Sequence, residues 1–407
     1  MIKRLFILIL SLTLPILLLG VSVFSFSGMP ETYAGRDIYG IGMGDTGVGN
    51  LLRANNSAKN ASLSCQNLYA TFATGIYFGN VNIKDKNSDT SFNGEISYLP
   101  YFSLSVPIYK NRIGISYQAI ANGKFTAEDF NMNDSDISEI RKADNSIYQV
   151  DLFYAYKFEK LNIGLAINYF FGHRTEYTRA DLGDPNLINP KYEVEESYTS
   201  PGFTMSFSKL MNESFSLGGA FSVPAKLNGE KTFKTITTNE KMDDSTFEMP
   251  FRASLGAAMA LNKNTHVSFD FDYDMWSKSN VYHNADDGYR IAFGIDYENS
   301  QSNKNFISKT GQRFGAAYRV SPLSSINANS HNLNEYSFSY GFSLPIKTRE
   351  SYIDIAVKYF NRSSNQTEFE ENGIIFSIGT SGFDILKKPL NRKGHRDIPK
   401  ADDVGLY

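Results

Sequence analysis

Hydrophobic and polar residues alternate along most of this chain, most regularly in the segment His266–Trp276, which reads HVSFDFDYDMW. Every second residue from Val267 to Met275 is apolar or aromatic, and Ser268 and three aspartates stand between them. A period of two predicts a β-strand, because successive side chains leave a strand on opposite faces. The pattern alone does not show which of the two strand faces contacts water. A soluble sandwich would bury the aromatic face, whereas a membrane barrel would turn it toward lipid.

Alternating segments of this kind recur from residue 68 to residue 383. They predict an all-β fold of fourteen strands, an even number, as bacterial outer-membrane barrels have. The predicted strands are Tyr69–Ile83, Ile96–Val106, Arg112–Gly123, Ser146–Phe158, Leu161–Phe171, Tyr198–Leu210, Phe215–Val223, Pro250–Leu261, His266–Trp276, Tyr289–Glu298, Gln312–Val320, Glu335–Pro345, Tyr352–Arg362 and Gly373–Phe383.

The connections between these segments differ in length according to strand parity. They are short after strands two, four, six, eight and twelve, whereas Asn299–Gly311 is longer than this rule predicts. Most connections after odd strands are predicted to be long polar loops: Lys124–Asn145, Arg174–Ser197, Ala225–Met249, Ser277–Gly288 and Ser321–Asn334. Short periplasmic turns and long outer loops are typical of outer-membrane barrels. We therefore predict a transmembrane antiparallel β-barrel with the aromatic strand faces toward lipid.

The polar strand faces would then line an enclosed lumen, where an unpaired charge is costly. A tight hairpin after residue 261 would place Arg252 opposite Asp274, and Arg290 lies on the next strand. We therefore expect Asp270, Asp272 and Asp274 to be structural lumen charges that pair with arginines, Arg252 and Arg290 first.

The amino terminus predicts export. Residues 1–27 contain Lys3 and Arg4, a long apolar run and small residues before Gly28, which is typical of a cleaved signal peptide. An uncleaved anchor helix is the alternative, because the apolar run is long enough to span a membrane. The net charge of −3 gives no basic field for nucleic acid. The single cysteine, Cys65, leaves no internal disulfide framework.

Residues 28–67 lack alternation and are rich in Gly, Asn, Ser and Ala. The run Gly42-Met43-Gly44-Asp45-Thr46-Gly47 matches GxGxxG, but a dinucleotide site also needs a preceding strand and a following helix, which this segment does not predict. We interpret the segment as a compact glycine-rich cap.

Several blocks resemble, in this order, the FadL-type outer-membrane channels for hydrophobic compounds, also described as the TodX group. The blocks are GIGMGDTGVGN, EMPFRASLGAAMALNKNTHVSFDFDYDMWS, DGYRIAFGIDYE, GQRFGAAYRVSP, EYSFSYGFSLPI and SYIDIAVKYF. Together they cover most of the mature chain. The resemblance implies a fourteen-stranded barrel, here residues 68–383, with an N-terminal plug inside it, here residues 28–67.

Two features depart from that family. Its plug usually carries Asn-Pro-Ala, but here Asn60-Ala61-Ser62 follows the plug glycines Gly42, Gly44 and Gly47 without a proline. Its barrel usually ends at an aromatic residue such as Phe383, whereas this chain continues with the basic segment 384–407. We expect that segment to be a periplasmic tail.

The resemblance also implies a function: passive uptake of hydrophobic compounds, such as long-chain fatty acids, across the bacterial outer membrane. Candidate apolar lining residues are Phe125, Phe130, Phe153 and Phe170, with ordinary lumen packing as the alternative. Gly123 is the candidate for a wall break, because glycine within a strand tolerates kinks. The expected partners are hydrophobic small molecules, outer-membrane lipid and the barrel assembly machinery.

Nothing in the sequence predicts an enzyme, a cofactor or a metal site. The five histidines form no Ser/His pair at motif spacing. The run Asp270-x-Asp272-x-Asp274 lacks the glycine and glutamate of a calcium loop, where Met275 and Val281 stand. Two other function classes remain open: an interaction barrel that serves a secretion or surface-attachment system, and a general porin for polar solutes.

Overall fold

The fold is taken from a computed structural model of the full chain. It describes residues 22–24, 31–32, 37–52, 58–67, 70–131, 138–183, 186–242, 244–279, 286–298, 310–323, 331–345, 352–365 and 367–383. The predicted tail 384–407 and most of the connection Asn299–Gly311 lie outside these ranges.

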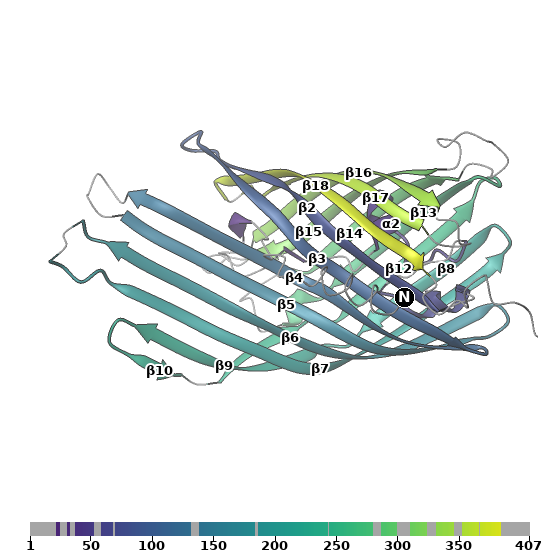
Figure 1. The fold of residues 1–407 in the computed structure, drawn as a ribbon, viewed down its shortest axis with the longest axis horizontal. Coiled ribbons are helices and arrows are strands. Elements are labelled where there is room, and N and C mark those ends of the chain that lie inside the picture. The colour runs from purple at the N-terminus through teal and green to yellow at the C-terminus, as the bar shows by residue number, and fades with distance from the viewer. Residues whose placement is uncertain are drawn as a thin grey trace, which may run out of the picture.

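An antiparallel sheet closes into a barrel where the last strand pairs with β2 (Figure 1). Fourteen strands form the wall when β8 with β9, and β11 with β12, are each counted as one interrupted strand and when β1 and β10 are left out. The wall strands are β2 (Thr71–Asp85), β3 (Ser91–Ile108), β4 (Asn111–Asn131), β5 (Ser138–Lys157), β6 (Leu161–Asp181), β7 (Lys191–Asn212), β8 (Phe215–Ser222), β9 (Ala225–Thr235), β11 (Ser245–Met249), β12 (Arg252–Ala260), β13 (Thr265–Asp274), β14 (Gly288–Tyr297), β15 (Gly311–Leu323), β16 (His331–Pro345), β17 (Tyr352–Ser363) and β18 (Phe369–Phe383).

The strand faces confirm the predicted orientation. In β13, the side chains of Phe269 and Phe271 are 47% and 37% exposed on the outer face, whereas Asp270 and Asp272 are 1% and 5% exposed inside. An apolar outer face around a polar interior is the pattern of a barrel in a lipid bilayer. The chain is therefore a transmembrane β-barrel. Within the described ranges, no helix is long and apolar enough to cross a membrane.

The wall is much taller on one side. The strands β4, β5, β6 and β7 contain 20 to 22 residues each, whereas β12 and β13 contain 9 and 10. About 9–11 residues suffice to cross a bilayer, so the long strands, together with β9 and β10 (Asn239–Lys241), extend past the membrane (Figure 1).

This extension corrects three predicted loops. The segments Lys124–Asn145, Arg174–Ser197 and Ala225–Met249 are mostly strand. Both faces of the extension carry charged residues, so the two-residue hydrophobic period disappears there. Cross-strand ion pairs such as Lys234–Glu195, at 2.5 Å, stabilise the pairing instead.

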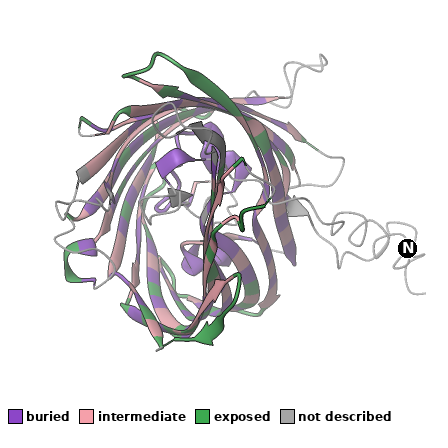
Figure 2. Ribbon diagram, turned by 90° about the vertical axis from the view of Figure 1, so that its left-hand side faces the viewer, coloured by how far each residue is buried: buried purple, intermediate pink, exposed green. Residues whose placement is uncertain are grey.

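The predicted plug lies inside the barrel. Its helical elements, α2 (Ile38–Gly42) and the 3₁₀ helix η2 (Ala61–Gln66), are surrounded by the wall when the barrel is viewed along its length (Figure 2). Each has a side-chain N-cap: Asp37 accepts a hydrogen bond from the Gly40 amide, and Asn60 accepts one from the Ser62 amide.

A short part of the predicted signal peptide also lies in the lumen. The Ser22 hydroxyl and the Val23 amide donate to the buried carboxylate of Glu371, at 3.1 and 2.6 Å. Cleavage before Gly28 would remove these contacts, so the mature amino terminus stays a prediction that N-terminal sequencing tests.

Candidate functional site

Glycines let the plug backbone touch the barrel wall directly. A Cβ atom on Gly44, whose φ is +73°, would lie 2.7 Å from the Ala316 nitrogen. A Cβ atom on Gly218 of β8 would lie 2.6 Å from the carbonyl oxygen of Val48 in the plug. Gly49 and Gly256 of β12 meet in the same way. Only a residue without a side chain permits these approaches.

Buried side-chain hydrogen bonds also join the plug to the wall. Asp270 of β13 accepts a hydrogen bond from the Val48 amide at 3.0 Å. The Asn60 side chain donates to the carbonyl oxygens of Val48 and Phe207 at 2.8 and 3.1 Å. The Ser62 hydroxyl donates to Ser208 of β7 at 2.8 Å. The Asn60-Ala61-Ser62 turn therefore binds the wall although it lacks the proline of the related family.

Buried ion pairs also bind the plug to the wall. Lys59 of the plug pairs with Asp272 at 2.6 Å, and the Arg290 Nε donates to the same carboxylate at 2.8 Å. Asp45 of the plug pairs with Lys358 of β17 at 2.9 Å. Sequence reasoning anticipated the Arg290–Asp272 pair but missed both plug partners, because they come from distant parts of the chain.

The expected pairing of Arg252 with Asp274 is confirmed for the strand register but not as an ion pair. The two residues are direct partners across β12 and β13, yet in the described ranges they form no ion pair. Arg252 instead donates to the Gln149 side chain at 3.1 Å and lies over the ring of Phe170, 5.9 Å from its centroid.

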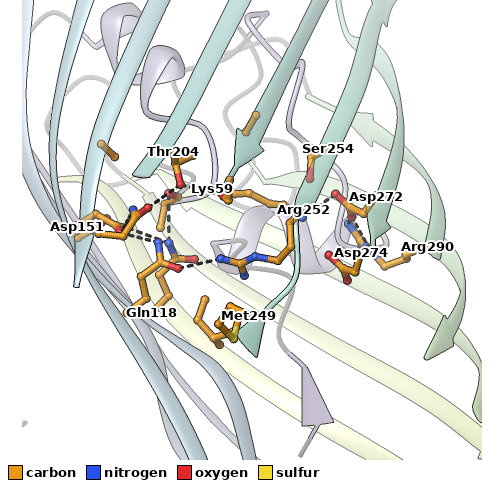
Figure 3. A pocket seen from close by; sticks show the side chains of 18 of the residues that line it. Lys59, Gln118, Asp151, Thr204, Met249, Arg252, Ser254, Asp272, Asp274 and Arg290 are labelled. Carbon is orange, nitrogen blue, oxygen red and sulfur yellow. Dashed lines mark hydrogen bonds and ion pairs between the residues drawn. The ribbon is translucent and has the colours of Figure 1, made fainter. Parts of the chain in front are cut away.

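A cavity opens between the plug and the wall on the β4–β7 side (Figure 3). One wall centres on Asp151, which accepts hydrogen bonds from the side chains of Ser116, Gln118, Gln149 and Asn168. Arg252, Ser254 and Asp274 line the facing wall. Apolar residues complete the lining: Ile120, Phe153, Met249, Trp276 and Val320.

The predicted lining aromatics fall into different surroundings. Phe153 lines the cavity and packs on Ala61 of the plug, and Phe170 belongs to an apolar cluster that also contains Trp276. Phe125 packs against a second cluster and does not border the cavity. Phe130 lies in β4, and its side chain is outside the described part.

The backbone ladder between β3 and β4 is interrupted. These strands pair only from Tyr101–Gln118 to Ile108–Asn111, although β3 starts at Ser91 and β4 ends at Asn131. Register shifts lie at Leu99–Pro100 of β3, against β2, and at Ile120 of β4, against β5. Proline has no N–H to donate, so Pro100 cannot continue the ladder. We call this gap the β3–β4 seam.

The amino-terminal part of the chain reaches the seam. The short strand β1 (Glu31–Thr32) pairs with Asn122 and Ala121 of β4, on the edge that β3 leaves uncovered. Gly123, the residue predicted for a wall break, lies next on this edge and pairs regularly with Asn145 of β5. The sequence signal closest to the seam was Pro100, which interrupts an alternating segment.

Comparisons with known proteins agree with this architecture. The family model described as BamG matches residues 1–384. A search of curated proteins finds no match. Among solved structures, a FadL homologue from Pseudomonas aeruginosa superposes with a TM-score of 0.63 at 14% identity, covering 88% of this chain and 99% of that one. The toluene transporter TbuX from Ralstonia pickettii gives 0.58 at 14%, covering 86% and 98%. The toluene transporter TodX from Pseudomonas putida gives 0.60 at 13%, covering 87% and 99%.

Proposed function

The chain belongs to the BamG family, and we propose that it is an outer-membrane channel for the passive uptake of hydrophobic compounds. The observation that carries the proposal is the β3–β4 seam, where a closed barrel loses its ladder beside buried apolar residues. The structures with which it shares its fold include two described as toluene transporters. Long-chain fatty acids are the finer proposal for the solute.

Two separate clusters of buried apolar residues reach β4 next to the seam. One cluster joins Ile120 and Ala121 of β4 to Phe170, Tyr198 and Leu227. The second cluster contains Ala119 with Tyr98 and Tyr101 of β3. A hydrophobic solute gains free energy on such surface in proportion to the apolar area that it covers. It could therefore enter from outside, cross the first cluster and leave between β3 and β4 into the bilayer.

A route straight through the lumen is disfavoured by the plug. Its contacts with the wall include backbone approaches at glycines, hydrogen bonds to Asp270 and Ser208, and the ion pairs of Lys59 and Asp45. Moving the plug would expose buried charges and break these contacts together, which is costly. We therefore propose lateral exit with the plug in place.

Crosslinking the plug to the wall separates the two routes. The hydroxyls of Ser62 and Ser208 are 2.8 Å apart, so the double variant Ser62→Cys/Ser208→Cys, made in a Cys65→Ser background, should form a disulfide. Uptake of toluene and of oleate by cells that carry the oxidised variant is expected to equal that of the reduced variant.

A wall-to-wall crosslink provides the control. The Thr71 and Ser105 hydroxyls of β2 and β3 are also 2.8 Å apart, and Thr71→Cys/Ser105→Cys leaves the plug unlinked. Loss of uptake in the plug crosslink alone, with recovery on reduction, would contradict lateral exit. Transport of oleate without toluene, or the reverse, would decide the solute class.

The seam itself can be tested by extending its ladder. Pro100→Val restores a backbone N–H donor to β3, and deletion of Ile120 removes the extra residue of β4. We expect β3 and β4 to pair further in the combined variant and uptake to fall. Pro107→Val is the matched control, because Pro107 lies in the same strand where β3 and β4 already pair. Equal uptake by the seam variant and the control would contradict a route through the seam.

The tall wall favours a second candidate function, an interaction barrel. The extension of β4–β7 stands far outside the bilayer on one side only (Figure 1), and neither toluene nor a fatty acid needs such height. A stable partner recovered through residues 384–407 or through the extension, without an uptake defect on deletion, would support this function.

A further inference from the structure

We propose that Arg252, Ser254 and Asp274 form a binding site in the lumen cavity for a small zwitterion that carries a carboxylate, an ammonium group and a short apolar side group. The site lies in the cavity between the plug and the wall. The proposal does not depend on the proposed uptake of hydrophobic compounds.

Two opposite charges face the cavity without forming a direct ion pair with each other in the described part of the chain. Arg252 and Asp274 are direct cross-strand partners, yet no ion pair joins them in the described part of the chain. Both line the cavity, where Arg252 uses one guanidinium nitrogen for Gln149 and places its guanidinium over the ring of Phe170 (Figure 3). A guanidinium and a carboxylate therefore remain available to one ligand.

Ser254 adds an unsatisfied hydroxyl to the same wall. It lies two residues after Arg252 on β12, its side chain is 1% exposed, and its Oγ has no hydrogen-bond partner among the described residues. A buried polar group left without a partner costs about 1–3 kcal/mol. A ligand with a donor or acceptor at this position would recover that cost.

The other charges of the cavity are already engaged. Asp151 accepts four side-chain hydrogen bonds, and Asp272 is held by Lys59 and Arg290. Arg319 also lines the cavity and interacts electrostatically with Asp274 and Glu335. The groups that keep hydrogen-bonding capacity for a ligand are thus Arg252, Asp274 and Ser254. A hydrocarbon would satisfy none of them, and a simple carboxylate would leave Asp274 unpaired. A zwitterion matches both charges, with its carboxylate on Arg252 and its ammonium on Asp274.

The remaining lining suits a short apolar group. Ile120, Met249, Trp276 and Val320 border the cavity beside the charged residues. Their position beside the polar wall lets one molecule place its charged groups and its side group on different surfaces. L-Leucine has this combination of groups and serves as the probe.

The chain carries a built-in reporter for binding. Trp276 is its single tryptophan and lines the cavity. We expect L-leucine to change the fluorescence of the purified full-length barrel in a saturable manner. The comparison compounds are 4-methylpentanoate, which lacks the ammonium group, and 3-methylbutylamine, which lacks the carboxylate. We expect the affinity of the barrel for each of these two compounds to be at least about tenfold lower than for L-leucine, because one charged hydrogen bond is lost.

Variants assign the two charges. Arg252→Gln should abolish the preference for leucine over the amine, and Asp274→Asn should abolish its preference over 4-methylpentanoate. Glu230→Gln, on the exposed wall extension, should bind as the wild type does. Circular dichroism and heat-modifiable gel mobility verify that each barrel is folded. The absence of saturable binding, or equal binding of leucine and either single-charge compound to the wild type, would overturn the proposal.

Discussion

At the scale of single residues, the three aspartates of β13 have different environments although they are equivalent in the sequence pattern. Asp270 binds the plug backbone, Asp272 holds a lysine and an arginine, and Asp274 faces the cavity. The environment of each aspartate depends on which part of the plug or cavity lies next to it in the lumen. A repeated residue type on one strand face therefore does not imply a repeated role.

Glycines decide how closely the plug can approach, and this can be measured. In Gly315→Ala, the new methyl group would collide with the backbone of Met43 and Gly44, whereas in Gly311→Ala of the same strand the nearest atom would be 3.7 Å away. We expect Gly315→Ala to lower the free energy of unfolding by about 1–3 kcal/mol. The measurement is urea unfolding of the refolded barrel, and equal midpoints for both variants would contradict a tight plug contact.

At the scale of elements, the wall extension is stabilised by charges and not by an apolar face. Glu196 of β7 lies 3.2 Å from Lys231 of β9 and 4.0 Å from Arg174 of β6, and it accepts a hydrogen bond from the Tyr198 hydroxyl. Burial opposes ionisation, but the Tyr198 hydrogen bond and the two cations outweigh it and hold the pKa of Glu196 below its ordinary value.

This lowered pKa predicts a loss of local stability in acid. The contribution of Glu196 is complete above the carboxyl's unfolded pKa of about 4.3 and disappears as the pH falls through its lower folded value. Hydrogen exchange in β7 and β9, corrected for intrinsic rates, should therefore accelerate below about pH 4. In Glu196→Gln the exchange should be faster at neutral pH and should lose this acid dependence. Unchanged protection of β7 and β9 in acid would show that the cluster does not hold the extension.

At the scale of the whole molecule, the plug closes a lumen that is otherwise wide enough to hold two short helices and a cavity (Figure 2). Deletion of residues 37–67 should leave a barrel, because the wall strands pair with one another around the whole circumference. In planar bilayers we expect the deletion variant to give a steady open conductance and the full chain to remain closed. Equal conductance of the two proteins would mean that the plug is not the barrier.

Much of the architecture could be predicted because its signal is local. The two-residue period of His266–Trp276 assigns a strand and two faces without any distant partner, and the parity of loop lengths turns the aromatic face outward. The Arg252–Asp274 register likewise followed from a tight hairpin. The extended strands were missed because charged residues on both of their faces remove the hydrophobic period.

The alternation and loop lengths of the sequence thus determined a fourteen-stranded barrel and its lipid-facing side, and a family resemblance indicated the segment that fills it. Only the tertiary structure decided where the plug binds, where the β3–β4 ladder stops and which lumen charges lack a close partner. Those features depend on contacts between residues far apart in the chain, such as Val48 with Asp270. The physical reason is that a strand's period fixes only which way a side chain points. Barrel closure and the path of the plug decide what that side chain meets.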